Sequence, residues 1–443
     1  MSGTVVIGGG LSGLARGYAL ARRGEDVRVL EATDRPGGAV RTEKEDGFLL
    51  ELGPNTVRPT PELWDLIGQI GLFDSVVLAD PRLPRSIEFE GKLHPLSPSP
   101  ATVLTTRLLS LSGKLRLLRE PLIAARNDPC ESVRDFFSRR LGPQFAERLI
   151  APFVSGIWAG DAGSLSAAAA FPALARWERE HGSLLAGAFA SRPKRGTPKS
   201  AHPRGLLSFR DGLETLPRVL TESLGPRLLR GSRVRSLRPE GGRWKVETAA
   251  APLEADEVVV ATPAFEAARL LETFEPEAAR ALAGVPQPPL AVLHLAWPVS
   301  AFSTPLKGFG HLVVPAPGRR ILGAVWSSCL FAGRAPEGQV LLTAFAGGSR
   351  DPETAALPDG RLLELAAAEL SASLGARSAP RLLRVTRYAR AIPQYDLDHG
   401  SRMAAVSKAE ARHPGLHLLG NYRGGISVGD VVKHGLGAGE FAD

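Results

Sequence analysis

The stretch TVVIGGGLSG at residues 4–13 decides the fold that we expect for this chain. Its first four residues are β-branched, which favours a strand, and the run of Ala, Leu and Arg from Leu11 to Arg23 favours a helix. The glycines between strand and helix predict a tight turn. Val27–Leu30 has the composition of a second strand, so the opening residues predict a βαβ unit with two parallel strands.

The glycines Gly8, Gly10 and Gly13 have the spacing of a dinucleotide-binding turn. The first permits the turn, the second lets the backbone approach a pyrophosphate, and the third lets helix and strand pack closely. The start of the helix adds free amides and a partial positive charge. Glu31, eighteen residues after Gly13, is expected to hold the ribose hydroxyls. A glycine turn without a ligand is the alternative, and the acid at this spacing argues against it.

The next stretch, RPGGAVRT at residues 35–42, favours FAD over NAD or NADP. It places Gly37 and Gly38 between Arg35 and Arg41, directly after the acid that is expected to bind ribose. Backbone donors and cations at this position can clamp a longer ligand than a nicotinamide dinucleotide. We therefore expect non-covalently bound FAD.

A third glycine-rich stretch, GNYRGGISVG at residues 420–429, lies near the end of the chain. It follows the apolar run Leu416–Leu419 and precedes an expected terminal helix. The start of that helix could face the flavin pyrimidine and stabilise the negative charge that develops at its N1–C2=O edge on reduction. An unliganded glycine turn is the alternative.

The composition is that of a globular protein without a membrane span. The chain has 443 residues, 44% apolar and 23% charged, which is enough for two or three domains. No window approaches the roughly 18 consecutive apolar residues of a transmembrane helix. Cys130 and Cys329 stand far apart, which excludes a disulfide framework, and no targeting segment precedes the first strand. We therefore expect a reducing, cytoplasmic location.

The net charge of +8 comes mostly from arginine and suits an anionic lipid surface or an anionic substrate. The basic residues are dispersed and lack the aromatic interleaving of base-stacking surfaces, so we expect no nucleic-acid partner. The segment 101–118 mixes leucine with basic residues, among them Arg107, Lys114 and Arg116, and Arg119 follows it. This pattern favours an interfacial amphipathic helix, and a core helix with a basic outer face is the alternative.

The remaining segments predict a helical middle region followed by a mixed sheet. The pattern from about Pro59 to Ala190 is largely helical, with a Pro/Ser-rich break at 94–100. Residues 191–205 combine prolines, glycines and basic side chains, so we expect a poorly ordered surface loop there. The segments expected after this loop are a β-hairpin at 233–248, a buried parallel strand at 258–262, a mixed sheet at 290–395 and a helix near 360–374.

Several longer stretches resemble one known family. The glycine motifs above, together with GFLLELGPNT at 47–56, are similar to the FAD-dependent protoporphyrinogen oxidases of the amine-oxidase-like flavoprotein superfamily. Further matches are APFVSGIWAGDAGSLS at 151–166, FPALARWEREHGSLLAGA at 171–188, GFGHLVVP at 308–315, FAGGSR at 345–350 and IPQY at 392–395. The resemblance runs from end to end, and the central matches are specific to porphyrinogen oxidases.

This resemblance implies oxidation of protoporphyrinogen IX to protoporphyrin IX in haem and tetrapyrrole biosynthesis. Six electrons would leave in three flavin cycles, with dioxygen as acceptor and hydrogen peroxide as product. The protein would mainly hold the macrocycle near the flavin N5, and no catalytic protein base is expected. The alternatives are a coproporphyrinogen III oxidase of the same family, a flavin amine oxidase or desaturase, and a non-enzymatic FAD- or porphyrin-binding protein. An amine oxidase needs an aromatic pair, of which Tyr422 could supply only one member.

The fold implied by the resemblance is α/β with three parts. A Rossmann-like FAD-binding domain would comprise residues 1–58, 206–265 and 405–443, and a mixed-sheet substrate-binding domain residues 59–84 and 266–404. Residues 85–205 would form a helical, membrane-associating domain. The resemblance thus implies peripheral attachment to an anionic membrane at the inner face of the cell membrane. It leaves a homodimer and a ferrochelatase partner open.

The motifs and the resemblance together give the residues expected at the cofactor site. Most follow the ends of strands or open helices, where backbone amides are free. The expected cofactor-binding residues are Gly8, Gly10, Leu11, Ser12, Gly13, Glu31, Ala32, Arg35, Gly37, Gly38, Arg41, Gly53, Pro54, Asn55, Val234, Ala261, Thr262, Gly420, Asn421, Gly425, Ile426, Ser427 and Val428.

The resemblance also implies three substrate-binding residues. Arg85 stands where the family carries its propionate-binding arginine, and Leu312 and Phe331 match apolar substrate-facing positions. A solvated arginine and two ordinary core residues are the alternatives. His311 matches no catalytic position and is expected to be structural. His413 and His417 are separated by a Pro-Gly pair that breaks any helix, so we expect no metal site.

Overall fold

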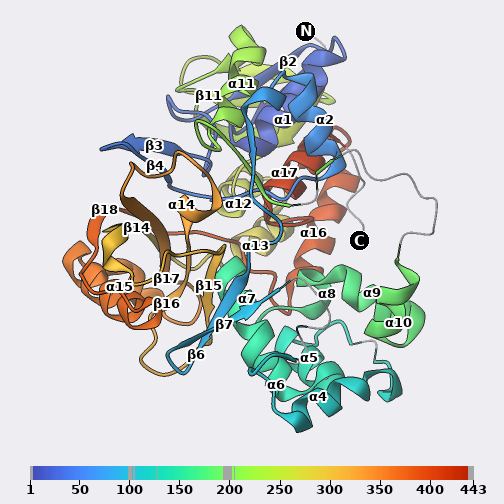
Figure 1. The fold of residues 1–443 in the computed structure, drawn as a ribbon. Helices are drawn as coiled ribbons and strands as arrows, with labels where there is room; N and C mark the ends of the chain where they lie inside the picture. The colour runs from blue at the N-terminus through green and yellow to red at the C-terminus, as the bar shows by residue number, and fades with distance from the viewer. Residues whose placement is uncertain are drawn as a thin grey trace.

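The computed structural model describes residues 3–97, 102, 105–126, 128–192, 202–203 and 205–437. Three parts are visible in Figure 1. A parallel sheet with its helices lies at the top, a mixed sheet with α15 (Asp359–Leu374) lies at the left, and a group of short helices lies at the bottom. We call this last group, α4 to α10, the helical unit.

The parallel sheet has the strand order β19-β13-β1-β2-β9, and every neighbouring pair in it is parallel. In register, Ile7 of β1 lies between Leu30 of β2 and Val260 of β13. The strands come from the start, the middle and the end of the chain, so one sheet joins three separate segments. The strand bounds are β1 Thr4–Ile7, β2 Val27–Leu30, β9 Leu228–Leu229, β13 Glu257–Val260 and β19 Leu416–Leu418. The predicted βαβ unit and the parallel strand near 258–262 are therefore confirmed.

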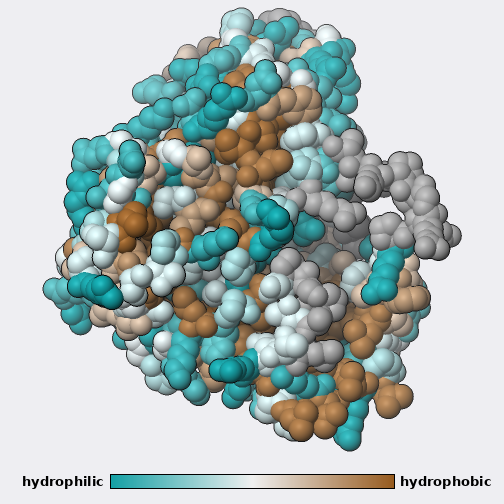
Figure 2. Space-filling view, in the orientation of Figure 1, coloured by the Kyte–Doolittle hydropathy of each residue, from teal (hydrophilic) through white to brown (hydrophobic). Residues whose placement is uncertain are grey.

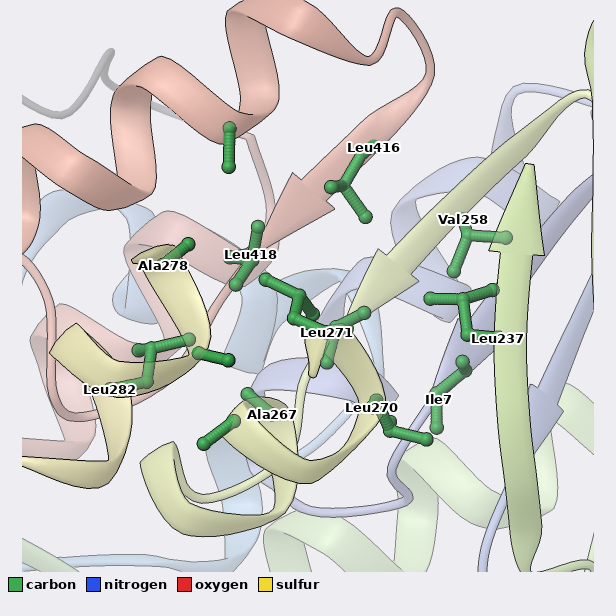
Figure 3. Packing of buried hydrophobic residues seen from close by; sticks show 14 of the residues in the cluster. Ile7, Leu237, Val258, Ala267, Leu270, Leu271, Ala278, Leu282, Leu416 and Leu418 are labelled. Carbon is green, nitrogen blue, oxygen red and sulfur yellow. The ribbon is translucent and has the colours of Figure 1, made fainter. Parts of the chain in front are cut away.

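Helices cover both faces of this sheet because its strands are apolar on both sides. Val6 and Val29 face one cluster, which contains leucines of α1, α2 and α11 and Val432 of α17. Ile7 and Val258 face the other, which contains α12, α13 and α16. Figure 3 shows Ile7 beside Leu270 and Val258 beside Leu237 in this second cluster. The helix bounds are α1 Leu11–Arg22, α2 Pro61–Gln69, α11 Thr215–Leu224, α12 Ala264–Leu271, α13 Pro276–Ala283, α16 His399–Arg412 and α17 Val428–Gly435.

Smaller strand pairs lie beside the parallel sheet. The predicted hairpin is confirmed, since β10 and β11 are antiparallel and the turn between them uses Gly241 and Gly242 at positive φ. The strands of these smaller pairs are β3 Thr42–Glu45 with β4 Phe48–Glu51, β5 Val76–Leu78 with β8 Leu207–Phe209, and β10 Val234–Glu240, β11 Arg243–Thr248 and β12 Leu253–Ala255 in one sheet.

The mixed sheet has the order β18-β14-β17-β16-β15-β6-β7, in which only the β15–β6 pair is parallel. It confirms the predicted mixed sheet, and α15 is the helix expected near 360–374. The largest buried side chain of its core is Trp297. The strand bounds are β6 Arg85–Phe89, β7 Lys92–Leu96, β14 Leu290–Pro298, β15 Gly310–Val313, β16 Ile321–Val325, β17 Gln339–Gly347 and β18 Arg381–Tyr388.

The pairing of β6 with β15 corrects the expectation that residues 85–205 form one helical part. Residues 85–96 complete the mixed sheet instead, and residues 94–96 of the break expected at 94–100 belong to β7. Sequence pattern alone missed this pairing because the partner strand lies more than two hundred residues later. The helices that follow are α4 Leu111–Leu118, α5 Val133–Leu141, α6 Pro143–Phe145, α7 Ala151–Trp158, α8 Ala167–Ala170, α9 Pro172–His181 and α10 Leu184–Ala190.

The segment 101–118 is not one continuous amphipathic helix, as the sequence had suggested. Residues 106–110 are not helical, and Ser110 caps α4 by accepting a hydrogen bond from the Gly113 amide at 3.2 Å. Residues 98–101, 103 and 104 lie outside the described residues, as does most of the surface loop expected at 191–205. Within the part of the chain that is described, no helix has the length and hydropathy needed to cross a bilayer.

Candidate active site

A cavity of about 460 Å³ opens at the carboxyl edge of the parallel sheet. We call it the sheet-edge cavity. Its walls come from the ends of β1, β2 and β13, from the starts of α1, α12 and α17, and from the loops around residues 37–40 and 420–426. In open α/β sheets ligands bind outside the carboxyl ends of the strands, so the cavity lies where the sequence placed the cofactor.

The three motif glycines have three different environments. Gly8 has φ +110°, a conformation that favours glycine, and a Cβ on Gly13 would lie 1.9 Å from the Gly8 carbonyl oxygen. These two positions need glycine because of the protein's own backbone. A Cβ on Gly10 would meet nothing within 4 Å, yet Gly10 lines the cavity. The space in front of Gly10 is therefore open to a ligand, as expected for the glycine that faces a pyrophosphate.

The start of α1 is available to an anion. Gly10 is its N-cap and supplies no side-chain acceptor, and the first turn contains no acidic residue. The first amides of an α-helix have no acceptor within the helix, and here they belong to Leu11 and Ser12, both of which line the cavity. Their N–H groups and the positive end of the helix dipole suit a phosphate.

The Glu31 carboxylate is fixed at the cavity wall by its own chain. Its Oε2 accepts the Gly9 amide at 2.9 Å, and its Oε1 accepts the amide and hydroxyl of Thr33 at 2.9 and 2.8 Å. These hydrogen bonds hold the side chain in one orientation. A carboxylate has about four acceptor positions, so Glu31 keeps capacity for ribose hydroxyls.

The arginines of RPGGAVRT do not line the cavity. Arg35 pairs with Glu214 at 3.4 Å and donates to the Gly38 carbonyl at 2.5 Å, while Arg41 pairs with Glu43. Arg35 thus shapes the 35–40 loop, and its contact with a ligand stays a prediction. The glycines of the same stretch do line the cavity, and Gly37 donates its amide to the Gly9 carbonyl at 2.8 Å.

The helix α17 starts at the cavity as predicted, since Val428 lines it together with Asn421 and Ile426. Ser427 caps this helix, and the Asp430 carboxylate accepts from the Ser427 hydroxyl at 2.6 Å in a capping box. The negative charge of Asp430 offsets part of the positive end of the helix dipole. The starts of α1 and α17 nevertheless open onto the same cavity, although they come from opposite ends of the chain.

Sixteen of the expected cofactor residues line the cavity, and seven are not among its lining residues. These seven are Gly13, Arg35, Arg41, Gly53, Asn55, Gly425 and Ser427. Lining residues that the sequence did not single out are Ile7, Leu30, Thr33, Ala39, Val40, Ser232, Arg233, Pro263, Glu266, Arg269, Leu270 and Val431. Ala39 and Val40 stand inside RPGGAVRT and could have been added, whereas Arg233, Glu266 and Arg269 carry no motif.

Two buried polar atoms at this site lack a hydrogen-bond partner in the described residues. They are the Thr262 hydroxyl, whose residue lines the cavity, and the Asn55 side-chain oxygen, one residue after the lining residue Pro54. Buried polar atoms are normally paired, so these two suit a polar ligand. With the open space at Gly10 and the free amides of α1, the residues present fit a dinucleotide.

None of the expected substrate residues lines the sheet-edge cavity: Arg85 and Leu312 lie on β6 and β15 of the mixed sheet, and Phe331 lies in the connection between β16 and β17. Arg85 opens β6, and its guanidinium lies over the Phe309 ring, 5.2 Å from the ring centre. Partial burial lowers the pKa of Arg85, and the charge of Arg58 lowers it further. In the part of the chain that is described, Arg85 forms no ion pair. Its positive charge is therefore available to the carboxylate of a ligand.

Leu312 and Phe331 have different surroundings. Leu312 is half-buried and faces α7, where a Cβ on Gly156 would lie 2.1 Å from a Leu312 methyl carbon. Phe331 is buried against Leu330, below the Arg334 guanidinium. Phe309, whose ring lies beneath the Arg85 guanidinium, packs against the cluster that contains Phe331. Phe331 is buried, but it also lines a second cavity of about 310 Å³ together with Arg334 and Val340. Its contact with substrate stays a prediction, and Phe309 is a neighbour of Arg85 that sequence reasoning missed.

The histidines take structural positions. His311 is buried and accepts a hydrogen bond from the Trp326 indole at 3.2 Å, and burial lowers its pKa to about 4, so it is neutral near pH 7. His413 pairs with Glu275 at 2.9 Å. The described residues contain no group of side chains that could hold a metal ion. Tyr422 is fully buried in the core and does not line the cavity, so it is not placed as an aromatic wall.

Comparison with known proteins agrees with this geometry. The family described as flavin containing amine oxidoreductase matches residues 11–439. The chloroplastic protoporphyrinogen oxidase of Oryza sativa subsp. japonica is 34% identical over 459 residues, covering 97% of this chain and 86% of that protein. The coproporphyrinogen III oxidase of Propionibacterium freudenreichii subsp. freudenreichii is 34% identical over 471 residues, covering 97% and 88%.

A solved structure shows the same fold. The crystal structure of a protein from Exiguobacterium sp. 255-15, provisionally named a protoporphyrinogen oxidase, has a TM-score of 0.79 and 25% identity, covering 98% of this chain and 97% of that one. The α/β architecture with mixed sheets is therefore that of the flavin amine oxidases. The chain belongs to the flavin-containing amine oxidoreductase family and, within it, to the porphyrinogen oxidases, and it is a flavoprotein oxidoreductase.

Proposed function

We propose that this protein oxidises protoporphyrinogen IX to protoporphyrin IX in haem biosynthesis, with FAD as cofactor and dioxygen as acceptor. The observation that carries the proposal is the 34% identity, over 97% of the chain, to a protoporphyrinogen oxidase. FAD, when bound, supplies the two-electron acceptor for each hydride removed from the macrocycle. Three such cycles account for the six electrons, and each reoxidation by dioxygen gives one hydrogen peroxide.

The sheet-edge cavity supports FAD as the cofactor. Its lining includes Glu31 and Val234, Leu11 and Ser12 at the start of α1, Asn421, and Val428 at the start of α17. A ligand that reaches both helix starts needs a nucleotide, a pyrophosphate and a second ring system in one molecule. The chain's own part is to hold and orient the cofactor by backbone amides and the Glu31 carboxylate.

The mixed sheet supports an anionic, largely apolar substrate. Arg85 offers a cation for a propionate, while Phe309 and Leu312 offer apolar surface for the macrocycle. Neither His311 nor any residue lining the cavity is assigned as a base. The protein therefore acts by positioning the macrocycle rather than by proton transfer from a dedicated side chain.

The direct test supplies flavin-loaded protein with reduced protoporphyrin under air and follows porphyrin fluorescence and peroxide. We expect both signals, and neither should develop without oxygen. A loaded protein that gives no signal above the enzyme-free control contradicts the proposal. It would instead support a binding protein without turnover.

Arg85 is tested by comparing Arg85→Ala with Arg82→Ala. Arg82 is a nearby exposed arginine that pairs with Asp80 at the surface. If Arg85 holds a propionate, its loss should lower kcat/KM by about tenfold or more, mainly through KM, whereas Arg82→Ala should change nothing. Equal kinetics in the two variants would remove Arg85 from the substrate site.

The second candidate is oxidation of coproporphyrinogen III. The observation that favours it is the coproporphyrinogen III oxidase that shares 34% identity with this chain, the same as the rice enzyme. That substrate carries more carboxylates, and Arg58 is a second cation close enough to lower the pKa of Arg85. Initial rates with the two porphyrinogens decide, and a higher kcat/KM for coproporphyrinogen would replace the first proposal.

We further propose that the helical unit attaches the protein to the anionic cytoplasmic face of the cell membrane. Leu111, Leu118 and Leu122 are 75%, 65% and 83% exposed, and Phe189 of α10 is 70% exposed. Figure 2 shows hydrophobic residues gathered at the lower edge of the molecule, where the helical unit lies. Arg107 and Arg119 are exposed nearby, whereas Arg116 donates to backbone carbonyls of α5 and faces inward.

Sedimentation with phosphatidylglycerol-containing vesicles tests this attachment. The wild type should sediment with the vesicles, and the double variant Leu111→Ser, Leu118→Ser should stay in the supernatant. Leu78→Ser, which changes an exposed leucine of β5, is the matched control and should sediment like the wild type. Equal sedimentation of all three proteins would contradict attachment through α4.

A further inference from the structure

The loop Gly420–Ser427, between β19 and α17, forms one wall of the sheet-edge cavity. Asn421 and Ile426 line the cavity, and the backbone turns between them at Gly424 and Gly425, which have φ +76° and +128°. Such a glycine-rich turn has many accessible conformations unless something outside it fixes its shape. The positions of Asn421 and Ile426 therefore depend on contacts that the two sides of the loop make with the rest of the protein.

One side chain outside the loop holds both sides. The Tyr395 hydroxyl donates to the Asn421 carbonyl at 2.9 Å and accepts the Gly425 amide at 2.9 Å. The same oxygen thus satisfies a backbone acceptor and a backbone donor four residues apart. Burial raises the pKa of Tyr395, so the phenol remains protonated and keeps its donor role at all working pH values.

The ring of Tyr395 is itself fixed between two other aromatic side chains. It stacks on His399 of α16, with ring centres 3.9 Å apart and planes at 11°, and meets the edge of Trp158 of α7 at 4.9 Å. Only 3% of Tyr395 is exposed. Its backbone carbonyl accepts the Ser166 amide at 2.8 Å. Tyr395 therefore contacts the helical unit through its ring and backbone, and it binds the wall of the cavity through its hydroxyl.

We propose that Tyr395 is a positioning residue for the flavin. By joining Asn421 to Gly425, its hydroxyl sets the shape of the Gly420–Ser427 loop and the place where α17 begins at the cavity. The inference depends on a flavin binding in the sheet-edge cavity. It does not depend on which porphyrinogen is the substrate.

Tyr422 provides a matched control within the same loop. It is the same residue type and is completely buried, but its hydroxyl has no hydrogen-bond partner in the described residues. Its ring packs in the core beneath the parallel sheet. Removing this hydroxyl leaves no backbone group of the loop unpaired, whereas removing the Tyr395 hydroxyl leaves two.

The test compares Tyr395→Phe, Tyr422→Phe and the wild type. Each apoprotein is titrated with FAD by quenching of flavin fluorescence, and the midpoint potential of the bound flavin is measured. Tyr395→Phe should bind FAD about tenfold more weakly and shift the potential, because the loop loses two hydrogen bonds. Tyr422→Phe should match the wild type within about twofold. A change in global stability alone would not move the potential.

A third measurement avoids mutation. Amide hydrogen exchange in the wild-type protein should be slow at Gly425, whose N–H is bonded to Tyr395, and faster at Gly424. Rapid exchange at Gly425, or a Tyr395→Phe variant with unchanged FAD affinity and potential, would overturn the proposal. If the wild type binds no FAD, the flavin assignment fails instead, and protection at Gly425 then still reports on the loop.

Discussion

Glycine turns and helix starts contribute backbone groups to the sheet-edge cavity, whereas the helical unit is held together by buried charged side chains. At the cavity, Gly8, Gly10 and Gly13 place strand and helix so that free amides face the ligand. In the helical unit, Arg140 and Glu120 are completely buried and paired. A backbone site can be found from the spacing of glycines, but a network of side chains leaves no such spacing in the sequence.

The buried network brings together segments that are far apart in the chain. Arg140 of α5 donates to the carbonyls of Ile123 and Gly182 at 2.8 and 2.9 Å and pairs with Glu120. Glu120 also accepts the Ser183 hydroxyl at 2.6 Å at the start of α10. These bonds hold the turn Glu120–Leu122, which follows α4, beside α10. The exposed leucines lie on α4 and this turn, and Phe189 lies on α10. The network therefore sets the shape of the apolar surface.

The largest effect is expected from Gly13→Ala at the cavity. Its methyl group would lie 1.9 Å from the Gly8 carbonyl, so strand and helix must separate, at a cost of more than about 3 kcal/mol. Gly10→Ala is the contrast, because nothing within 4 Å opposes its methyl group. It should keep the apoprotein within about 1 kcal/mol of the wild type but weaken FAD binding about tenfold or more. Urea unfolding and FAD titration distinguish the two, and equal stability losses would contradict the account.

An effect of comparable size is expected from Arg140→Met in the helical unit. The change leaves the buried Glu120 carboxylate without its partner, which costs about 3–5 kcal/mol. Arg218→Ala removes an exposed ion pair with Glu222 and should cost about 0–1 kcal/mol. The free energy of unfolding in urea measures both. Similar losses for the two variants would mean that the buried network does not hold the unit together.

A change of pH tests a buried group that remains uncharged, in contrast to the network. Burial lowers the pKa of His311 from 6.5 to about 4. Between these pH values the imidazole is protonated in the unfolded chain and neutral in the native state. The stability that His311 contributes is complete above pH 6.5 and is lost as the pH falls toward 4. Between pH 7 and pH 5 this amounts to roughly 2 kcal/mol. His311→Phe should flatten the profile by that amount, and an unchanged profile would contradict the assignment.

The smallest effect on stability is expected at the exposed face of α4. Leu111→Ser and Leu118→Ser change side chains that are 75% and 65% exposed, so each should alter the free energy of unfolding by no more than about 0.5 kcal/mol. The same double variant is expected to lose vesicle binding. A large decrease in the free energy of unfolding would show that these leucines pack against the protein's own core and are not exposed at its surface.

The sequence predicted features that depend on local patterns better than features that depend on contacts between distant residues. The βαβ unit, the hairpin, the helix start at Leu11 and the terminal helix near the last glycine stretch were predicted, because local glycine and β-branched patterns determine them. The pairing of β6 with β15 was missed because it is non-local. The ion pair of Arg35 with Glu214, a residue 179 positions later, was also missed, because no local pattern connects the two residues.

Side-chain roles in the site were predicted less well than backbone roles. Glu31 lies where its spacing placed it, at the cavity wall. Phe331 was expected to face the substrate; it is buried in a small cluster and also lines a second cavity, and an apolar residue gives no sign in the sequence of which role it takes. Tyr395 lies in the IPQY stretch at 392–395, and no role could be assigned to it from the sequence. Its contact with the Asn421–Gly425 turn exists only in the folded chain.

The most direct test of the central claim is the flavin content of the purified protein. The protein is denatured in acid, and the released chromophore is identified by chromatography and quantified against the chain. We predict one molecule of FAD per chain in the wild type. The Gly10→Ala variant should contain much less FAD although its apoprotein is about as stable as the wild type. A wild-type protein that is colourless, and stays so after incubation with FAD, would contradict the claim that the two helix starts hold a flavin.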